Sequence, residues 1–205
     1  FFQGVGTTVE LALYTAIFGT LLGIVVALLR MSKVKLLKVL AGAYIEFLRG
    51  TPLLVQVLIV FYGLPQMGIK LPRMTAGTVA LVINSAAYMA EIVRSGIQAI
   101  DGGQTEASRS LGMNGAQTMI YIILPQAIKN ILPAIGNEFV SIIKESSILY
   151  TIGIYELTYQ ANKLASTNFR YLETLTISAL IYFVLTFTAS RLLGMLERRM
   201  RRGDR

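Results

Sequence analysis

Long apolar runs without charged side chains are the feature that most constrains this chain. The run 11–29 is uncharged throughout and is rich in leucine, isoleucine, valine and glycine. A helix needs about 20 such residues to cross roughly 30 Å of hydrocarbon. No basic segment precedes the run and no small-residue cleavage site follows it. We therefore interpret it as a membrane span and not as a signal peptide.

Four further segments have the length and apolar character of spans. The predicted spans are residues 9–29, 40–64, 75–100, 126–150 and 173–196. Charged residues make up only 15% of the 205 residues, against roughly 25% in soluble domains. We expect an all-α integral membrane protein in which residues 1–205 form a single transmembrane domain of five helices. Within the second span, Gly50-Thr51-Pro52 predicts either a kink or an unwound break.

The residue types that are missing exclude several kinds of chemistry. The chain contains no cysteine and no histidine. Without them it lacks the usual ligands of zinc, haem and iron–sulfur centres, and it cannot form a Ser-His-Asp triad. It also lacks a G-x-x-x-x-G-K-[ST] phosphate-binding loop. We therefore predict no metal site, no catalytic residue and no cofactor bound by this chain.

The distribution of basic residues predicts the orientation in the membrane. The predicted cytoplasmic loops and tail contain Arg30, Lys33, Lys35, Lys38, Arg109, Lys129, Arg198, Arg199, Arg201, Arg202 and Arg205. The predicted outer loops contain Lys70, Arg73, Lys163 and Arg170. Because basic residues favour the cytoplasmic side, we expect the N-terminus outside and the C-terminus in the cytoplasm. The basic tail is expected to contact anionic membrane lipid. It has no interleaved aromatic residues, so we expect no nucleic-acid partner.

The loop 101–125 between the third and fourth spans carries most of the information about function. Asp101-Gly102-Gly103 predicts a turn. The following residues predict a short amphipathic helix that ends at Gly112, with Thr105 as a candidate N-cap. By periodicity alone, this loop is an interfacial helical hairpin, and a plain solvated connector would have the same pattern.

At these residues the sequence resembles a known family. Glu106-Ala107-Ser108, three residues, Gly112, nine residues and Ile122-Ile123-Leu124-Pro125 follow the pattern E-A-A-x3-G-x9-I-x-L-P. This pattern is the coupling-loop signature of ABC importer permeases, and Ser108 replaces one small residue, alanine, with another. Segments 46–56 and 85–97 resemble the polar amino-acid uptake branch of these permeases, and 144–149 matches that branch more loosely.

The resemblance implies the type I ABC importer permease fold, with a cytoplasmic coupling helix between spans three and four. It also implies a multi-pass protein of the bacterial cytoplasmic (inner) membrane that is a transport subunit and not an enzyme. The implied partners are a second permease subunit, identical or homologous, an extracytoplasmic amino-acid-binding protein and a dimer of cytoplasmic ABC ATPase subunits, which bind ATP and Mg. The residues expected to couple to the ATPase are Glu106, Ala107, Ser108, Leu111 and Gly112.

Ionisable groups inside spans indicate a transport pathway or an ion pair, because placing a charge in hydrocarbon costs at least a few kcal/mol. Glu145 and Glu138 lie two turns apart in the fourth span, on nearly the same side. The predicted substrate-binding residues are Glu145, Ser146, Ser147, Tyr150, Asn84, Ser85, Tyr88 and Glu138. A structural ion pair of Glu145 with another span is the alternative. Two i,i+3 pairs, Glu91–Arg94 and Glu46–Arg49, are expected to be structural.

Two acidic residues in one span favour a substrate with a cationic side chain, which would offset their cost. We therefore expect import of a basic amino acid: arginine, lysine or histidine. The alternatives are the same machine for glutamine, glutamate or another polar amino acid. From a different class, the alternative is an ion-coupled carrier or channel. A membrane-embedded enzyme would need histidine, cysteine or paired carboxylates, which the sequence does not offer.

Overall fold

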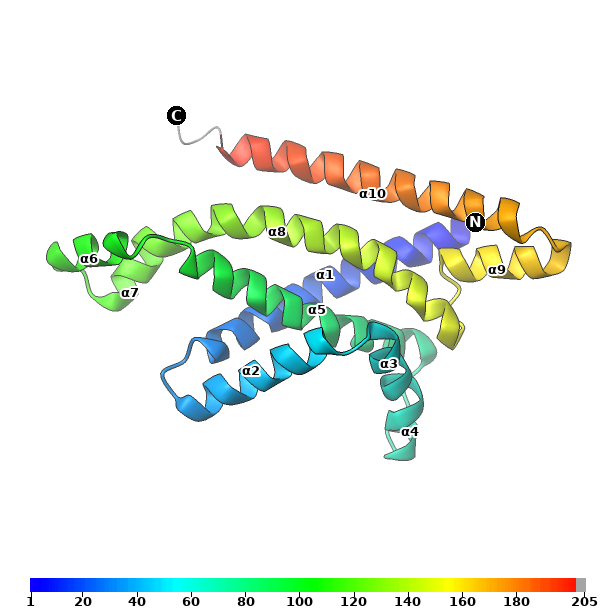
Figure 1. Ribbon diagram of the computed structural model, residues 1–205, viewed down its shortest axis with the longest axis horizontal. Helices are drawn as coiled ribbons and strands as arrows, with labels where there is room; N and C mark the ends of the chain where they lie inside the picture. The colour runs from blue at the N-terminus through cyan, green and yellow to red at the C-terminus, as the bar shows by residue number, and fades with distance from the viewer. Residues whose placement is uncertain (202–205) are drawn as a thin grey trace.

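The computed structural model describes residues 1–201, and every regular element in this part is a helix. The long helices lie side by side as a bundle (Figure 1). Four of them are long and apolar enough to cross a membrane, or five if the bent pair formed by α2 and α3–α4 counts as one span. This agrees with the predicted all-α, five-span architecture. Arg202 and Arg205 of the predicted lipid-contacting tail lie outside the described residues.

Helix α1 (Phe2–Arg30) packs along α5 (Arg73–Gln98), and glycines permit the close approach. A Cβ atom on Gly19 would lie 3.0 Å from the Ser85 Oγ, and one on Gly23 would clash with Met89. Small residues four apart allow helix backbones to approach closely in a membrane. The remaining face of α1 exposes large apolar side chains, as a lipid-facing helix does.

The second predicted span is two helical pieces bent by 107°. Helix α2 (Lys35–Gly50) is followed by α3 (Leu53–Leu58), the π-helical turn η1 (Ile59–Gly63) and α4 (Leu64–Gln66). Pro52 has no N–H, so the Leu48 carbonyl loses its normal partner four residues later. The Gln56 side chain replaces that donor, with Nε2 2.8 Å from the Leu48 oxygen and 2.9 Å from the Thr51 Oγ1. The Gly50-Thr51-Pro52 segment is therefore a sharp bend with its free carbonyl satisfied.

Helix α6 (Gly102–Ser110) occupies the loop after α5 and lies at one end of the molecule (Figure 1). Asp101 caps it by accepting a hydrogen bond from the Gly103 N–H at 2.7 Å, so the expectation that Thr105 is the cap is wrong. The helix begins earlier than predicted because Asp101 precedes two glycines that adopt the helical conformation. Gly112, with φ +86°, ends it in a left-handed turn. The Met113 N–H then bonds the Ser108 carbonyl at 3.1 Å.

The fourth span is a continuous series of helical segments. It comprises α7 (Gly115–Gln117), the π-helical segment η2 (Thr118–Ile123), α8 (Leu124–Glu145) and the 3-10 segment η3 (Ser146–Ile152). Together they extend from the end that holds α6 toward the opposite end of the molecule (Figure 1).

Two helices complete the described chain. Helix α9 (Leu157–Asn168) lies at the opposite end from α6, and α10 (Tyr171–Arg201) returns alongside α8 (Figure 1). Glu156 caps α9 and is fully buried; it accepts hydrogen bonds from the Thr158 N–H, the Tyr159 N–H and the Tyr182 hydroxyl. Burial raises the pKa of Glu156, although these hydrogen bonds act in the opposite direction. Helix α9 is an element that the sequence analysis did not predict.

Candidate functional site

The structure brings together polar groups from three elements of the bundle. Ser85 and Tyr88 lie one turn apart on α5, and the Ser85 hydroxyl donates to the Glu138 Oε1 of α8 at 3.3 Å. The Arg49 guanidinium at the end of α2 lies 5.3 Å from the centroid of the Tyr88 ring. We call Arg49, Ser85, Tyr88 and Glu138 the polar cluster. It offers one cation and one carboxylate, which suits a ligand that carries both charges.

Glu145 lies two turns beyond Glu138 and is half-buried. Its charge and that of Arg49 both act on the Glu138 carboxylate, whereas the charge that acts on Glu145 is that of the adjacent Lys144. The Arg49 guanidinium and the two carboxylates lie in α2 and α8, and neither carboxylate belongs to an ion pair among the described residues. Arg49 near Glu138 and Lys144 beside Glu145 attract these carboxylates without a contact ion pair, so the carboxylate oxygens are not held by a salt bridge.

The residues after Glu145 have differing surroundings. Ser146 is fully buried, and its hydroxyl donates to the Ile143 carbonyl at 2.8 Å. Ser147 lines a cavity of about 390 Å³ against α10, together with Lys144 and Tyr182. The Tyr150 side chain is 44% exposed. Ser146 is thus engaged within its own helix, whereas Ser147 and Tyr150 remain accessible.

Asn84 is buried and faces the bend of the second span. Its Nδ2 donates to the Gln56 Oε1 at 2.9 Å, so the amide belongs to the network that closes the bend. The sequence analysis assigned no role to Gln56 and expected a different partner for Arg49. A signal for Gln56 was present, since a polar side chain four residues after a helix-interrupting proline is placed to bond the carbonyl that the proline leaves free.

Of the two expected ion pairs, one is confirmed and one is wrong. The Arg94 Nε donates to Glu91 at 2.9 Å within α5, as predicted. Glu46 does not pair with Arg49; its carboxylate lies 3.6 Å from the Arg30 guanidinium. The turn between α1 and α2 places Arg30 across Gly42, where it reaches Glu46, and Arg49 turns to the Tyr88 ring instead.

The residues expected to couple to the ATPase lie on and just beyond α6. Glu106, Ala107, Leu111 and Gly112 are exposed, and the Leu111 side chain is 84% exposed. Ser108 is buried against η2. The exposed residues on and beyond α6 are therefore accessible to a partner protein, and Ser108 is not.

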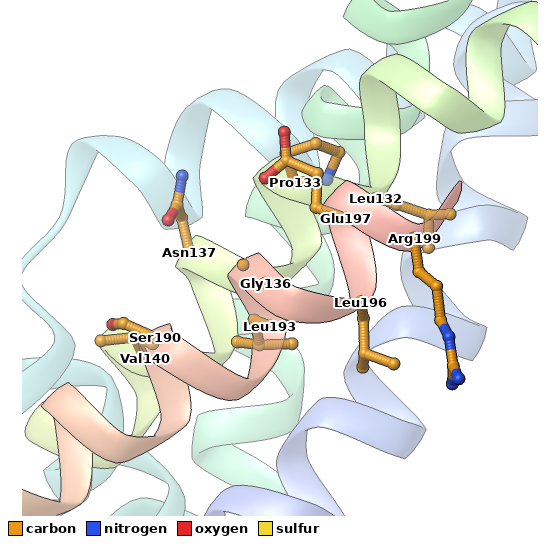
Figure 2. A pocket seen from close by; sticks show the side chains of 11 residues that line it. Leu132, Pro133, Gly136, Asn137, Val140, Ser190, Leu193, Leu196, Glu197 and Arg199 are labelled. Atoms are coloured by element: carbon orange, nitrogen blue, oxygen red, sulfur yellow. The ribbon is translucent and has the colours of Figure 1, made fainter. Parts of the chain in front are cut away.

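A separate groove of about 560 Å³ lies between α8 and α10 (Figure 2). Its lining is mainly apolar and includes Pro133, Gly136 and Leu193, with Asn137 and Arg199 at its edge. None of the predicted substrate-binding residues lines this groove. We therefore place the candidate site at the polar cluster and not here.

Comparison with known proteins defines the class of this chain. Residues 19–202 match the family described as "Binding-protein-dependent transport system inner membrane component". The chain belongs to this family and is the transmembrane permease subunit of an ABC importer, not a catalytic subunit. Members of the family work in complexes with ATPase subunits and binding proteins. The ion-coupled carrier and the membrane-embedded enzyme are thereby excluded.

Similarity to individual proteins narrows the class to permeases for polar amino acids. The chain is 40% identical over 203 residues to the arginine transport system permease protein ArtQ of Bacillus subtilis (strain 168), covering 98% of this chain and 93% of ArtQ. It is 42% identical over 179 residues to the probable glutamine ABC transporter permease protein GlnM of the same organism, covering 87% of this chain and 83% of GlnM.

A solved structure is closely similar as well. A chain from the crystal structure of an amino acid ABC transporter with histidines superposes with a TM-score of 0.93 at 52% identity, covering 97% of this chain and 92% of that chain. The MetNI methionine ABC transporter shares the fold, with a TM-score of 0.76 at 18% identity. Relatives named for arginine and for glutamine are about equally similar, so the amino acid must be argued from the residues.

Proposed function

We propose that this chain carries a basic amino acid, arginine, lysine or histidine, into the cytoplasm. The observation that supports this most is the pair Glu138 and Glu145, two turns apart in the fourth span. Two carboxylates in a span cost free energy unless a cation compensates them. A guanidinium or ammonium group of the substrate would do so through charge-assisted hydrogen bonds.

Arg49 suggests how the amino acid is oriented in the site. Its guanidinium is exposed, stacks on Tyr88 and lies within electrostatic reach of Glu138. A guanidinium binds a carboxylate through two parallel hydrogen bonds. We expect Arg49 to bind the α-carboxylate of the amino acid, while Glu138 and Glu145 bind the cationic side chain. Ser85 and Tyr88 would add neutral hydrogen-bonding groups, whereas Ser147 lines the cavity against α10, away from the polar cluster.

The assembly proposed around this site has the partners typical of the family. Two permease subunits, identical or homologous, would enclose one path in membrane lipid, and an extracytoplasmic binding protein would deliver the amino acid. Helix α6 would dock into a dimer of ATPase subunits, which bind ATP and Mg. The topology we propose has the N-terminus outside and the C-terminus in the cytoplasm, supported by the basic residues that flank α1 and α10.

Docking through α6 is tested at Leu111. Replacing this exposed side chain by aspartate would place a charge in the proposed interface and should release the ATPase from the purified complex. Ser110→Asp is the matched control, because Ser110 is the last residue of α6, directly before Leu111, and its hydroxyl bonds the Glu106 carbonyl of the same helix. Retention of the ATPase by Leu111→Asp would contradict the docking proposal.

The substrate is tested in vesicles that contain the full complex and its binding protein. Labelled arginine uptake is measured with unlabelled lysine, histidine, glutamine, glutamate or agmatine as competitor. We expect lysine and histidine to compete and glutamine and glutamate to fail. Best competition by glutamine or glutamate would overturn the basic amino acid and favour the alternative substrate.

Agmatine tests the role of Arg49, because it is arginine without the carboxylate. Direct binding to the permease–ATPase complex should favour arginine over agmatine by about tenfold, the value of one charge-assisted hydrogen-bonded contact. Arg49→Gln should remove most of that preference. An unchanged preference in Arg49→Gln would show that another group binds the carboxylate.

A further inference from the structure

Helix α6 is joined to the fourth span by a short segment that contains a glycine turn. The chain passes from Ser110 through Leu111 and Gly112 to Asn114 before α7 begins. Such a turn is a compliant connection, since glycine adopts many backbone conformations at little cost. A push on α6 would reach α8 poorly through this backbone alone.

A direct side-chain contact bridges the same two elements. The Ser108 Oγ lies 3.0 Å from the Thr118 Oγ1, and the two residues are 4% and 3% exposed. The π-helical segment η2 that begins with Thr118 is the element against which α6 packs, and it continues directly into α8. The contact therefore joins the loop helix to the base of the span that carries Glu138.

The direction of the hydrogen bond follows from the remaining partners. The Ser108 hydroxyl donates to the Thr105 carbonyl at 2.9 Å, so its single proton is used within α6. The Thr118 hydroxyl must then donate to the Ser108 oxygen. Inside a helix, threonine commonly bonds the carbonyl four residues earlier, here that of Asn114. Thr118 instead uses its proton to connect two elements.

We propose that the Ser108–Thr118 hydroxyl pair is a positioning contact that transmits the movement of α6 to the fourth span. The proposal rests on the proposed docking of α6 to the ATPase. Ser108 occupies the position where the E-A-A pattern has alanine, which has no hydroxyl to offer. The pair makes α6, η2 and α8 move as one body instead of bending at Gly112.

The test compares three variants with wild type in vesicles that contain the full complex. Ser108→Ala and Thr118→Val each remove one hydroxyl, and Ser108→Ala/Thr118→Val removes both. The measured quantity is the number of ATP molecules hydrolysed per amino acid transported. We expect each single variant to raise this ratio severalfold, because losing one buried hydrogen bond shifts the equilibrium between coupled and uncoupled α6 by about fivefold. The double variant should be no worse than the singles, because the two side chains make one shared contact.

Two controls separate transmission from a general loss of structure. Ser110→Ala removes a hydroxyl from the same helix that bonds only the Glu106 carbonyl, and it should leave the ratio unchanged. The exchange Ser108→Thr/Thr118→Ser keeps both hydroxyls and should restore a ratio close to that of wild type. The thermal midpoint of the complex should change little across the set. The Thr118 hydroxyl can turn to the Asn114 carbonyl when Ser108 is lost, and the Ser108 hydroxyl keeps its bond to the Thr105 carbonyl when Thr118 is lost.

The outcomes are decisive for the pair. Wild-type ratios in Ser108→Ala and Thr118→Val, additive effects in the double variant, or an equal effect of Ser110→Ala would overturn the proposal. Loss of the ATPase from Ser108→Ala would also overturn it, because a buried positioning contact is not a docking contact. Failure of the docking proposal is distinct, since it would appear as an ATPase retained by Leu111→Asp.

Discussion

Glu156 and Glu138 are two glutamates withdrawn from solvent in one helical bundle, and their carboxylates have opposite surroundings. The Glu156 carboxylate accepts hydrogen bonds from the Tyr159 N–H at 2.6 Å, the Tyr182 hydroxyl at 2.7 Å and the Thr158 N–H at 2.8 Å. Its side chain is fully buried, so every donor comes from the protein. Such a closed network holds α9 and α10 in a single arrangement.

The Glu138 carboxylate is only half-buried and accepts a single long hydrogen bond, 3.3 Å from the Ser85 hydroxyl. Its charged neighbours are Glu145, which repels it, and Arg49, which attracts it. Much of its hydrogen-bonding capacity is therefore available to a ligand. The comparison teaches that a satisfied carboxylate supports the fold, whereas an unsatisfied one in the same bundle is a candidate binding group.

The largest expected effect is at Glu156. Replacement by alanine leaves two N–H groups and the Tyr182 hydroxyl without their acceptor and removes the cap of α9. We expect a loss of about 3 kcal/mol in the free energy of unfolding, measured as a lower thermal midpoint of the purified complex. Glu173→Ala, an exposed glutamate in the first turn of α10, should stay within about 0.5 kcal/mol of wild type. Equal midpoints for both variants would show that the hydrogen bonds of Glu156 do not stabilise the fold.

A smaller loss is expected at Gln56, whose amide is as fully paired as Glu156. Replacement by leucine leaves the Leu48 carbonyl and the Asn84 amide unpaired, which should cost about 2 kcal/mol. The matched control is Gln66→Leu, at an exposed position near the end of α4. Thermal unfolding of the two variants side by side is the measurement. A Gln56→Leu complex as stable as the control would show that water hydrogen-bonds the Leu48 carbonyl and the Asn84 amide in its place.

The long apolar helices and the loop helix could be predicted because they depend on local sequence. Apolar runs such as 11–29 are long enough to identify a span without any tertiary information. Gly112 likewise predicts the end of a helix, and its positive φ in the structure confirms that prediction.

What could not be predicted depends on contacts between helices. Glu46 and Arg49 have ideal i,i+3 spacing, but Arg30 from the preceding helix reaches Glu46 and leaves Arg49 to Tyr88. The role of Gln56 likewise requires the 107° bend, which a proline permits without fixing its angle. The substrate-binding role of residues such as Glu145 remains a prediction, because local sequence names candidates and not their partners.

At Glu145 we expect an effect on the substrate and not on the fold. Glu145→Gln should weaken arginine binding to the permease–ATPase complex about tenfold, because one charge-assisted hydrogen bond becomes neutral. Basal ATP hydrolysis and the thermal midpoint should change little. Unchanged arginine affinity in Glu145→Gln would show that Glu145 does not bind the substrate. A lowered thermal midpoint with unchanged affinity would show that its role is structural.

The smallest expected effect is a pH dependence that originates at Glu156. Its pKa is raised in the folded protein, so the folded state holds the proton at a pH where the unfolded chain has released it. The free energy of unfolding should therefore decrease as the pH rises from the ordinary glutamate pKa of 4.5 through the raised one. Thermal midpoints against pH should show this slope in wild type, and Glu156→Gln should flatten it. An equal slope in both would assign it to other groups.

The most direct test of the central claim, that the open carboxylates receive a cationic side chain, compares arginine with citrulline. Citrulline has nearly the same shape but a neutral end group. Binding of each is measured by calorimetry on the permease–ATPase complex without the binding protein, whose own specificity would mask that of the permease. Wild type should bind arginine at least about tenfold more tightly than citrulline, and Glu138→Gln should lower this preference clearly. Equal binding in wild type, or an undiminished arginine preference in Glu138→Gln, would contradict the account.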